Sequence, residues 1–140
     1  MKQLPIKYNK FIPFKGFFAI CLFGIIYIRD FNKERKIHKS TINHEGINIC
    51  QIEDFIQNPD NKKWKTILGG CIFYILYFIE WLIKLLISAF TLGKVRAYSS
   101  ISFEQEAYNN QYYYTYQKNR KRFAWVQYIF KLKKSNTEYL

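Results

Sequence analysis

The chain has 140 residues, of which 49% are hydrophobic and 20% aromatic, and its formal net charge is +12. So large an apolar share excludes a disordered chain, and the length allows one domain of ordinary size, 1–140. The three cysteines are widely spaced and form no CxxC pair, so they predict small buried side chains and no disulfide framework. The charge leaves open a soluble basic surface, an anionic membrane surface, an acidic partner or nucleic acid.

The first apolar segment, residues 12–29, predicts a β-type element. It is rich in aromatic and β-branched residues, and Pro13, Gly16 and Gly24 interrupt it at intervals that suit two short strands. Lys15 shortens its uncharged stretch to below the roughly 20 residues that a membrane-spanning helix needs. No small-residue cleavage pattern follows, so a signal peptide is not expected.

Residues 40–57 predict a helix that follows a charged loop. Isoleucines recur at roughly helical spacing after Ser40 or Thr41, either of which can cap the N-terminus of a helix. The proline within residues 58–61 would end this helix.

Residues 67–92 are the most hydrophobic part of the chain and predict a long helix, unless Gly69 and Gly70 break it. At full length this helix would extend about 39 Å, enough to cross a bilayer. Glu80 and Lys84 interrupt it at a spacing that lets them pair, and such a pair is costly in lipid unless it faces protein. A core helix, a membrane-embedded helix and a helix lying half in the membrane interface all remain open.

Two further helices are predicted, over residues 100–118 and 122–133. Ser100 or Ser102 would cap the first, and the second is a short amphipathic segment. The residues after it are expected to fray.

Residues 43–51 contain His44, Glu45 and, four positions after the histidine, Asn48. Two histidines at i and i+4 share one face of a helix and can hold a zinc ion, while the glutamate after the first histidine acts as general base. Here Asn48 stands in place of the second histidine, and an amide oxygen is a weaker zinc ligand than imidazole. Taken alone, the string fits a surface His-Glu pair better than a metal site.

Residues 100–108 add two carboxylates, Glu104 and Glu106, beside the small Ala107. A small residue permits close approach of two helices, so a neighbouring glutamate can reach a metal held on the first helix. Acidic residues are scarce in this basic chain, which weighs against a simple solvated turn.

With these strings in order, the chain resembles a family of small zincin-like metallopeptidases of Bacteroidetes, a minimal form of gluzincin. The family signature reads NHExIHxxQ, then an apolar helix with a glutamate, then ISFExEAY. This chain matches it at 43–51, 77–82 and 97–108, and residues 12–29 resemble the N-terminal portion of the family. The resemblance covers most of residues 12–132.

The resemblance implies a mainly α fold with a short N-terminal β-hairpin (α+β) and a minimal zincin-like helical core. It implies a zinc-dependent peptidase, in which zinc polarises the scissile carbonyl and acidifies a water. His44 and Glu106 would be metal ligands, Glu104 the fallback third ligand and Glu45 the general base. The second histidine of the family falls on Asn48, so we expect weak zinc occupancy and little activity.

Glu80 would be a buried carboxylate near this site or the partner of Lys84, and the structural pairing is the expectation.

Two functions follow from these observations. The first is a bacterial metallopeptidase-like protein, cytoplasmic or membrane-associated, that acts on a peptide or protein substrate. The second is a non-catalytic basic module that keeps the fold and binds a membrane surface or a protein partner. A membrane protein with spans near 17–28 and 67–92 would leave the match at 100–108 unexplained.

Nucleic acid is not the expected partner. The tyrosines within 112–116, beside basic residues 118–122, could stack bases over a basic groove. Aromatic residues at this spacing more often pack against a neighbouring helix or an interface.

Overall fold

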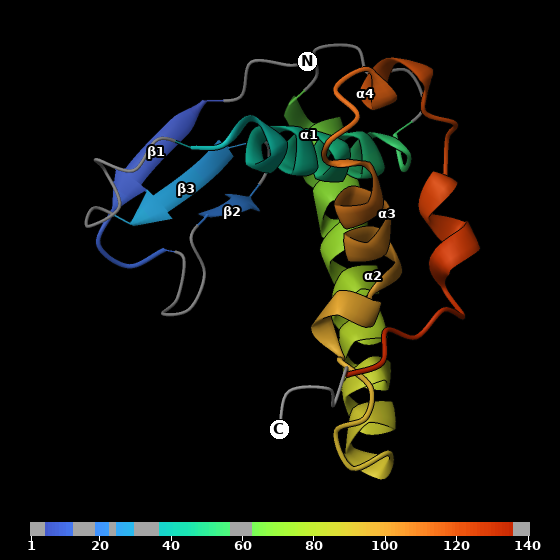
Figure 1. Cartoon of the computed structure of the whole chain (residues 1–140). Helices are drawn as coiled ribbons and strands as arrows, with labels where there is room; N and C mark the ends of the chain where they lie inside the picture. Colours follow the sequence, from blue (N-terminus) through green and yellow to red (C-terminus); the bar gives the residue numbers. More distant parts are fainter. Residues whose placement is uncertain (1–4, 13–18, 23–24, 30–36, 57–62, 136–140) are drawn as a thin grey trace.

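Helices dominate the computed structural model, and a small sheet lies beside them on the N-terminal side (Figure 1). The predicted mainly α fold with a short N-terminal β element is therefore confirmed. The structure describes residues 5–12, 19–22, 25–29, 37–56 and 63–135.

The sheet has three strands, β1 (Ile6–Asn9), β2 (Ala19–Leu22) and β3 (Ile25–Arg29), in the order β1-β3-β2. β2 and β3 are antiparallel, as a hairpin requires, and β1 adds to β3 in parallel. Ile26 and Ile28 of β3 are buried, as expected for alternate residues on the covered side of a strand. These strands exclude a helical membrane span over 17–28.

The helix α1 (Lys39–Glu53) corresponds to the helix predicted at 40–57. Its N-cap is His38, whose side chain accepts a hydrogen bond from the Ser40 backbone N–H, so the predicted cap at Ser40 or Thr41 is wrong. The helix ends at Glu53, before the predicted end at residue 57, and the predicted stop at 58–61 lies outside the described residues.

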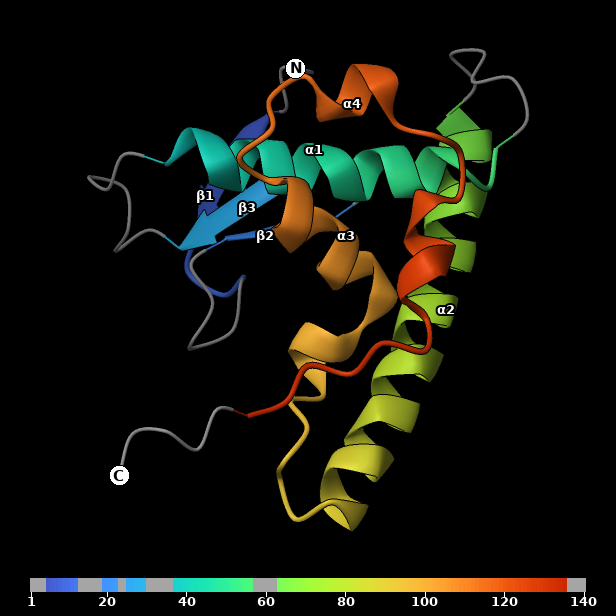
Figure 2. The same cartoon turned by 45° about the vertical axis from the view of Figure 1, so that its right-hand side comes forward.

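The helix α2 (Lys63–Phe90) runs without a break through Gly69 and Gly70. A Cβ atom at position 69 would lie 2.6 Å from Cγ1 of Ile56, so this glycine allows the end of α1 to approach α2 closely. α1 crosses α2 near the N-terminal end of α2, and the C-terminal part of α2 extends well beyond this crossing (Figure 2).

The two sides of α2 differ in their surroundings. On the covered side, Phe73 packs with Ile52, Ile101 and Phe103 in the hydrophobic core, and Tyr77 packs against this cluster. The opposite side is apolar and open, and its residues are each between 43% and 59% exposed. We call this side the outer face of α2, and it comprises Ile67, Leu68, Ile75, Phe78, Ile79, Leu82, Ile83 and Leu86.

Among the helices of the described ranges, α2 is the one long and apolar enough to cross a membrane, and 17% of its most apolar stretch is buried. Cys71 of α2 is exposed and Cys50 of α1 is half-buried. The predicted burial of the cysteines is therefore wrong for Cys71. The side chain of Cys21 lies outside the described ones.

The C-terminal third is more broken than predicted. In place of one helix over 100–118, the chain forms the short 3-10 helix η2 (Tyr98–Ser100), α3 (Ser102–Asn110) and the single-turn α4 (Tyr116–Asn119). The side chain of Asn43 donates to the carbonyls of Asn110, Gln111 and Tyr113, so α1 holds the chain where α3 ends.

The helix predicted over 122–133 is also wrong, because only the 3-10 helix η3 (Ala124–Tyr128) forms there. Phe123, which precedes η3, has a left-handed backbone with φ of 57°, a conformation that does not continue a helix. Beyond η3, the carbonyl of Lys133 accepts from the N–H of Arg96 and is used outside any helix.

Candidate functional site

The centre of the site is a buried pair, His44 of α1 and Glu104 of α3. Their Nε2 and Oε2 atoms are 3.3 Å apart, and both side chains are less than a tenth exposed. Glu104 was expected only as the fallback ligand. The two residues are 60 positions apart in sequence, and the packing of α3 against α1 brings them together.

Glu106, the carboxylate expected beside His44, is engaged elsewhere. Residues two apart on a helix differ in direction by about 200°, so Glu104 and Glu106 project from different sides of α3. Arg120 donates to both oxygens of Glu106, and Tyr116 and Gln51 each donate to one of them at 3.0 Å. The structure thus pairs His44 with Glu104 in place of Glu106.

Arg120 extends this second cluster to α1. Its Nη1 and Nη2 atoms donate to the two oxygens of Asp54 at 2.8 and 2.7 Å, in a bidentate pair that is nearly fully buried. Arg122 donates to the backbone carbonyl of Asp54. Asp54, Arg120 and Glu106 therefore form a closed ion network that joins α1, α3 and the segment after α4.

Three tyrosines surround Glu104. Tyr77 of α2 donates its hydroxyl to Oε1 at 2.9 Å. Burial raises the pKa of Tyr98 and Tyr108 above the ordinary value of 10, and the charge of Glu104 raises both further. The ring of Tyr108 also meets the ring of His44 edge-on, with centroids 4.6 Å apart.

The charge of Glu104 also controls His44. Burial lowers the pKa of His44, but the hydrogen bond and charge of Glu104 raise it by more, with a smaller contribution from the charge of Glu45. The pKa therefore lies above the ordinary value of 6.5. A proton on the imidazole thus balances the buried negative charge of the carboxylate.

One buried oxygen atom on the His44 side of α1 lacks a partner within the described residues. Asn48 lies one helical turn after His44, on the same side of α1. Its Oδ1 atom is buried and has no hydrogen-bond partner within the described ranges. An unpaired buried oxygen is costly, so Oδ1 of Asn48 suits a donor or a cation.

The separation within the pair is that of a direct ion pair, and it is also compatible with two ligands of one zinc ion. Two ligand atoms about 2.0–2.2 Å from a tetrahedral zinc are about 3.4 Å apart, and Nε2 of His44 and Oε2 of Glu104 are 3.3 Å apart. The described residues contain no group of three His, Cys, Asp or Glu side chains placed to hold a metal. Asn48 would therefore have to supply a third, weaker ligand.

Glu45, the expected general base, is buried on α1 beside this pair. It is close enough for its charge to raise the pKa of both His44 and Tyr108. The charge of Glu45 therefore acts on the imidazole of its sequence neighbour, His44.

Other residues of the matched strings position the helices. Asn43 accepts a hydrogen bond at 2.7 Å from the side-chain amide of Gln117, in addition to its donor contacts with the end of α3. Gln51 donates to the carbonyl of Phe103 at 3.0 Å. These amides fix α3 and α4 against α1, which sets the position of Glu104.

Glu80 has a structural role, as expected. Its Oε1 atom lies 3.9 Å from Nζ of Lys84, and its two oxygens accept from the backbone N–H and the hydroxyl of Ser102 at 2.9 and 2.6 Å. Glu80 thus caps α3 from a neighbouring helix, and the predicted cap by the side chain of Ser100 or Ser102 is wrong. The capped residue, Ser102, lies two residues before Glu104.

A pocket of about 350 Å³ lies over the ion network and is lined by Cys50, Glu53, Asp54, Ile56, Gln117, Arg120 and Arg122. It contains none of the residues of the His44–Glu104 pair.

Sequence reasoning singled out His44, Glu45 and Asn48 as candidates but did not single out the tyrosines around Glu104. For Tyr108 a signal was present, since it follows Glu104 by four residues and so shares its side of α3. Tyr77 and Tyr98 come from other elements and carry no such spacing. Comparison with protein-family models, curated proteins and solved structures gives no match to this chain.

Proposed function

We propose that this chain is a metallopeptidase-like protein whose divalent-cation site, at His44, Glu104 and Asn48, is weak. The observation that carries the proposal is the buried 3.3 Å contact between Nε2 of His44 and Oε2 of Glu104. Imidazole and carboxylate are ligands that zinc favours, and the unpaired oxygen of Asn48 comes from the same side of α1. The resemblance to zincin-like peptidases supports His44 as a ligand and Glu45 as the general base, with Glu104 taking the place expected for Glu106.

The residues present have distinct tasks in this proposal. Zinc, when bound, would supply Lewis-acid polarisation of a peptide carbonyl. Glu45, next to His44, would accept and return a proton as general acid–base. Tyr77 orients Glu104 through its 2.9 Å hydrogen bond, and the ring of Tyr108 packs against His44.

Asn48 limits the affinity of the site. Catalytic zinc sites have three strong protein ligands, whereas this site has two and a neutral amide. The chain as it stands should therefore hold zinc weakly and hydrolyse peptides slowly.

Calorimetric zinc titration of Asn48→His tests this proposal. We expect its affinity to exceed that of the unchanged chain by at least about tenfold, and hydrolysis of an unstructured peptide to become measurable. Lys39→His is the matched control, because it adds a histidine at an exposed position of the same helix. Equal zinc affinity of the two variants would contradict the proposal.

The second candidate function is a non-catalytic basic module, membrane-associated or bound to a protein partner. The observation that favours it is the small number of strong ligands at the site, one imidazole and one carboxylate in direct contact. The His44–Glu104 pair would then be a structural ion pair. In that case Asn48→His would fold normally and bind zinc no better than Lys39→His.

A further inference from the structure

The outer face of α2 is unusual for a soluble protein. Its eight residues are each close to half exposed, and Trp64 and Phe90 continue the apolar surface toward the two ends of the helix. Soluble monomers rarely expose a continuous apolar patch along a whole helix. In Figure 2, the right-hand side of α2 below the crossing with α1 has no other described element beside it.

The length of α2 matches a lipid bilayer. Its 28 residues extend about 42 Å, whereas the hydrocarbon core of a bilayer is about 30 Å thick. The segments packed on the covered side carry the exposed Lys121, Arg122 and Lys131, so only the outer face can enter this core, with both ends of the helix at the level of the headgroups.

The charged residues in the middle of α2 lie on the covered side, which is the reverse of a soluble surface helix. The side chains of Glu80 and Lys84 are 14% and 5% exposed. Glu80 is satisfied by Ser102, and Nζ of Lys84 donates to the carbonyl of Ile129. Ionisable groups in membrane-embedded helices are arranged in this way, facing protein and paired.

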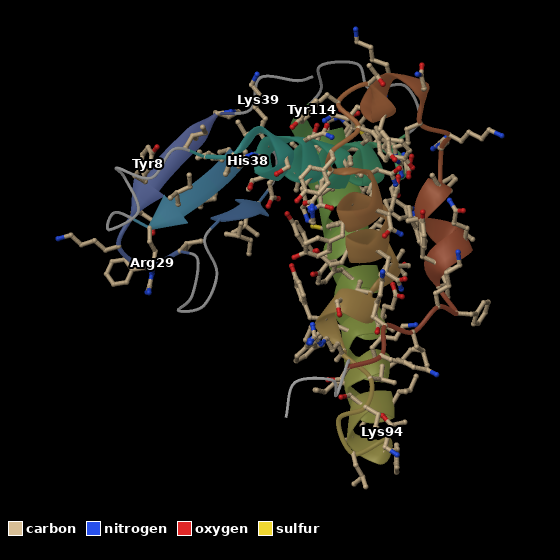
Figure 3. All side chains as sticks on the ribbon, viewed as in Figure 1. Tyr8, Arg29, His38, Lys39, Lys94 and Tyr114 are labelled. Carbon is tan, nitrogen blue, oxygen red and sulfur yellow. The ribbon has the colours of Figure 1, made fainter. Side chains whose placement is uncertain are left out.

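Basic residues gather at both ends of α2. Lys63 and Lys65 flank Trp64 at the start, and Lys94 lies just beyond the end of the helix (Figure 3). Lys134, paired with Val95 in a β-bridge, is exposed at the same end. Lysines and tryptophan at the two ends of an apolar helix suit the level of anionic headgroups.

Charge separates a bilayer from a second copy of this chain as the occupant of the outer face. Because both ends of α2 are basic, two copies packed through this face would bring like charges together in either orientation. An anionic bilayer instead complements both ends of the helix and the net charge of +12.

We propose that the outer face of α2 is embedded in the acyl chains of an anionic lipid bilayer, with the basic ends of the helix at the headgroups. This inference rests on the membrane association named in the second candidate function, and not on the absence of a cation site. It is independent of the cation site.

Flotation of the full chain with lipid vesicles tests the proposal. The chain is synthesised in a cell-free system in the presence of vesicles of phosphatidylcholine, with or without phosphatidylglycerol. We expect it to float with the vesicles, more completely with the anionic ones, and to resist extraction by high salt and by alkaline carbonate. Release by salt alone would overturn embedding, because it would show adsorption by charge only.

A matched pair of variants locates the contact. Ile75→Asp with Phe78→Asp places two charges on the outer face, and each charge is strongly unfavourable in a membrane helix. We expect the carbonate-resistant fraction to fall by at least about tenfold. The control is Tyr112→Asp with Tyr113→Asp, which changes two equally exposed aromatic residues outside α2 and should keep the fraction unchanged. Equal losses in both variants would overturn the assignment of this face.

Cys71 provides a second, independent measurement. It is exposed and lies on the same side of α2 as Leu68 and Ile75. Vesicles should slow its modification by a water-soluble maleimide, read by mass spectrometry, by at least about tenfold, while Tyr112→Cys stays reactive. Protection of Cys71 without lipid, together with a stable dimer, would identify a second copy as the occupant and overturn the proposal.

The zinc titration of Asn48→His is unaffected by either result, so failure of the membrane inference and failure of the cation site are distinguishable.

Discussion

Two buried carboxylates on α3, only two residues apart, are held in opposite ways. Glu106 has both oxygens saturated by Arg120, Tyr116 and Gln51. Glu104 has one oxygen bound to Tyr77 and the other in contact with His44. Both carboxylates are buried, so burial does not separate their roles. The number of hydrogen bonds to each carboxylate does: the fully bonded one stabilises the fold, and the less bonded one is available to a ligand.

The largest expected effect comes from breaking the saturated cluster. Arg120→Met should destabilise the fold by about 3–5 kcal/mol, because it leaves Asp54 and Glu106 buried without their cation. Chemical denaturation measures the free energy of unfolding. Arg96→Met, at an exposed position, is the control and should change it by less than about 0.5 kcal/mol. A loss below about 1 kcal/mol in Arg120→Met would show that the network is not a structural support.

The second test removes the charge of Glu106 or of Glu104 singly and compares the two losses of stability. Glu106→Gln should cost roughly 2–3 kcal/mol, since Arg120 loses its ionic partner. Glu104→Gln should lower the free energy of unfolding by about 1 kcal/mol or less, because fewer hydrogen bonds to this side chain would be lost. The same denaturation measurement ranks the two variants, and the reverse order would refute the assignment of roles.

The smallest expected effect is a shift in titration. NMR should find the pKa of His44 above 6.5 in the unchanged chain and lower in Glu104→Gln, where burial is opposed by less charge. The folded-state pKa exceeds the unfolded one, so the contribution of the pair to stability is complete below about pH 6.5 and is lost as pH rises through the folded-state pKa. A pKa that does not move in Glu104→Gln would mean that another group sets it.

Local patterns predicted the elements of the fold better than their contacts. The spacing of isoleucines predicted α1, and with it the common face of His44 and Asn48, because helical periodicity is a property of neighbouring residues. The hydropathy of 67–92 predicted α2, although the glycine pair did not break the helix and Gly69 proved to be a contact point.

The choice between Glu104 and Glu106 could not be predicted from the sequence. It depends on Arg120, which comes from a segment with no periodic pattern and reaches back to Asp54 of α1. The missing C-terminal helix has a similar cause. Lys84 and Arg96 bond to carbonyls of Ile129 and Lys133 that a helix would need for itself.

The bonds from α1 to distant residues have a consequence for biosynthesis. Asp54 and Arg120 are 66 positions apart, so at about 5–20 residues per second the ribosome needs roughly 3–13 seconds to supply the second after the first. Within that interval α2, which lies between them, is completed 30 residues before Arg120 is made, and its apolar side is uncovered. The nascent chain therefore presents its most apolar helix to chaperones, translocon or lipid before Arg120 can pair with Asp54.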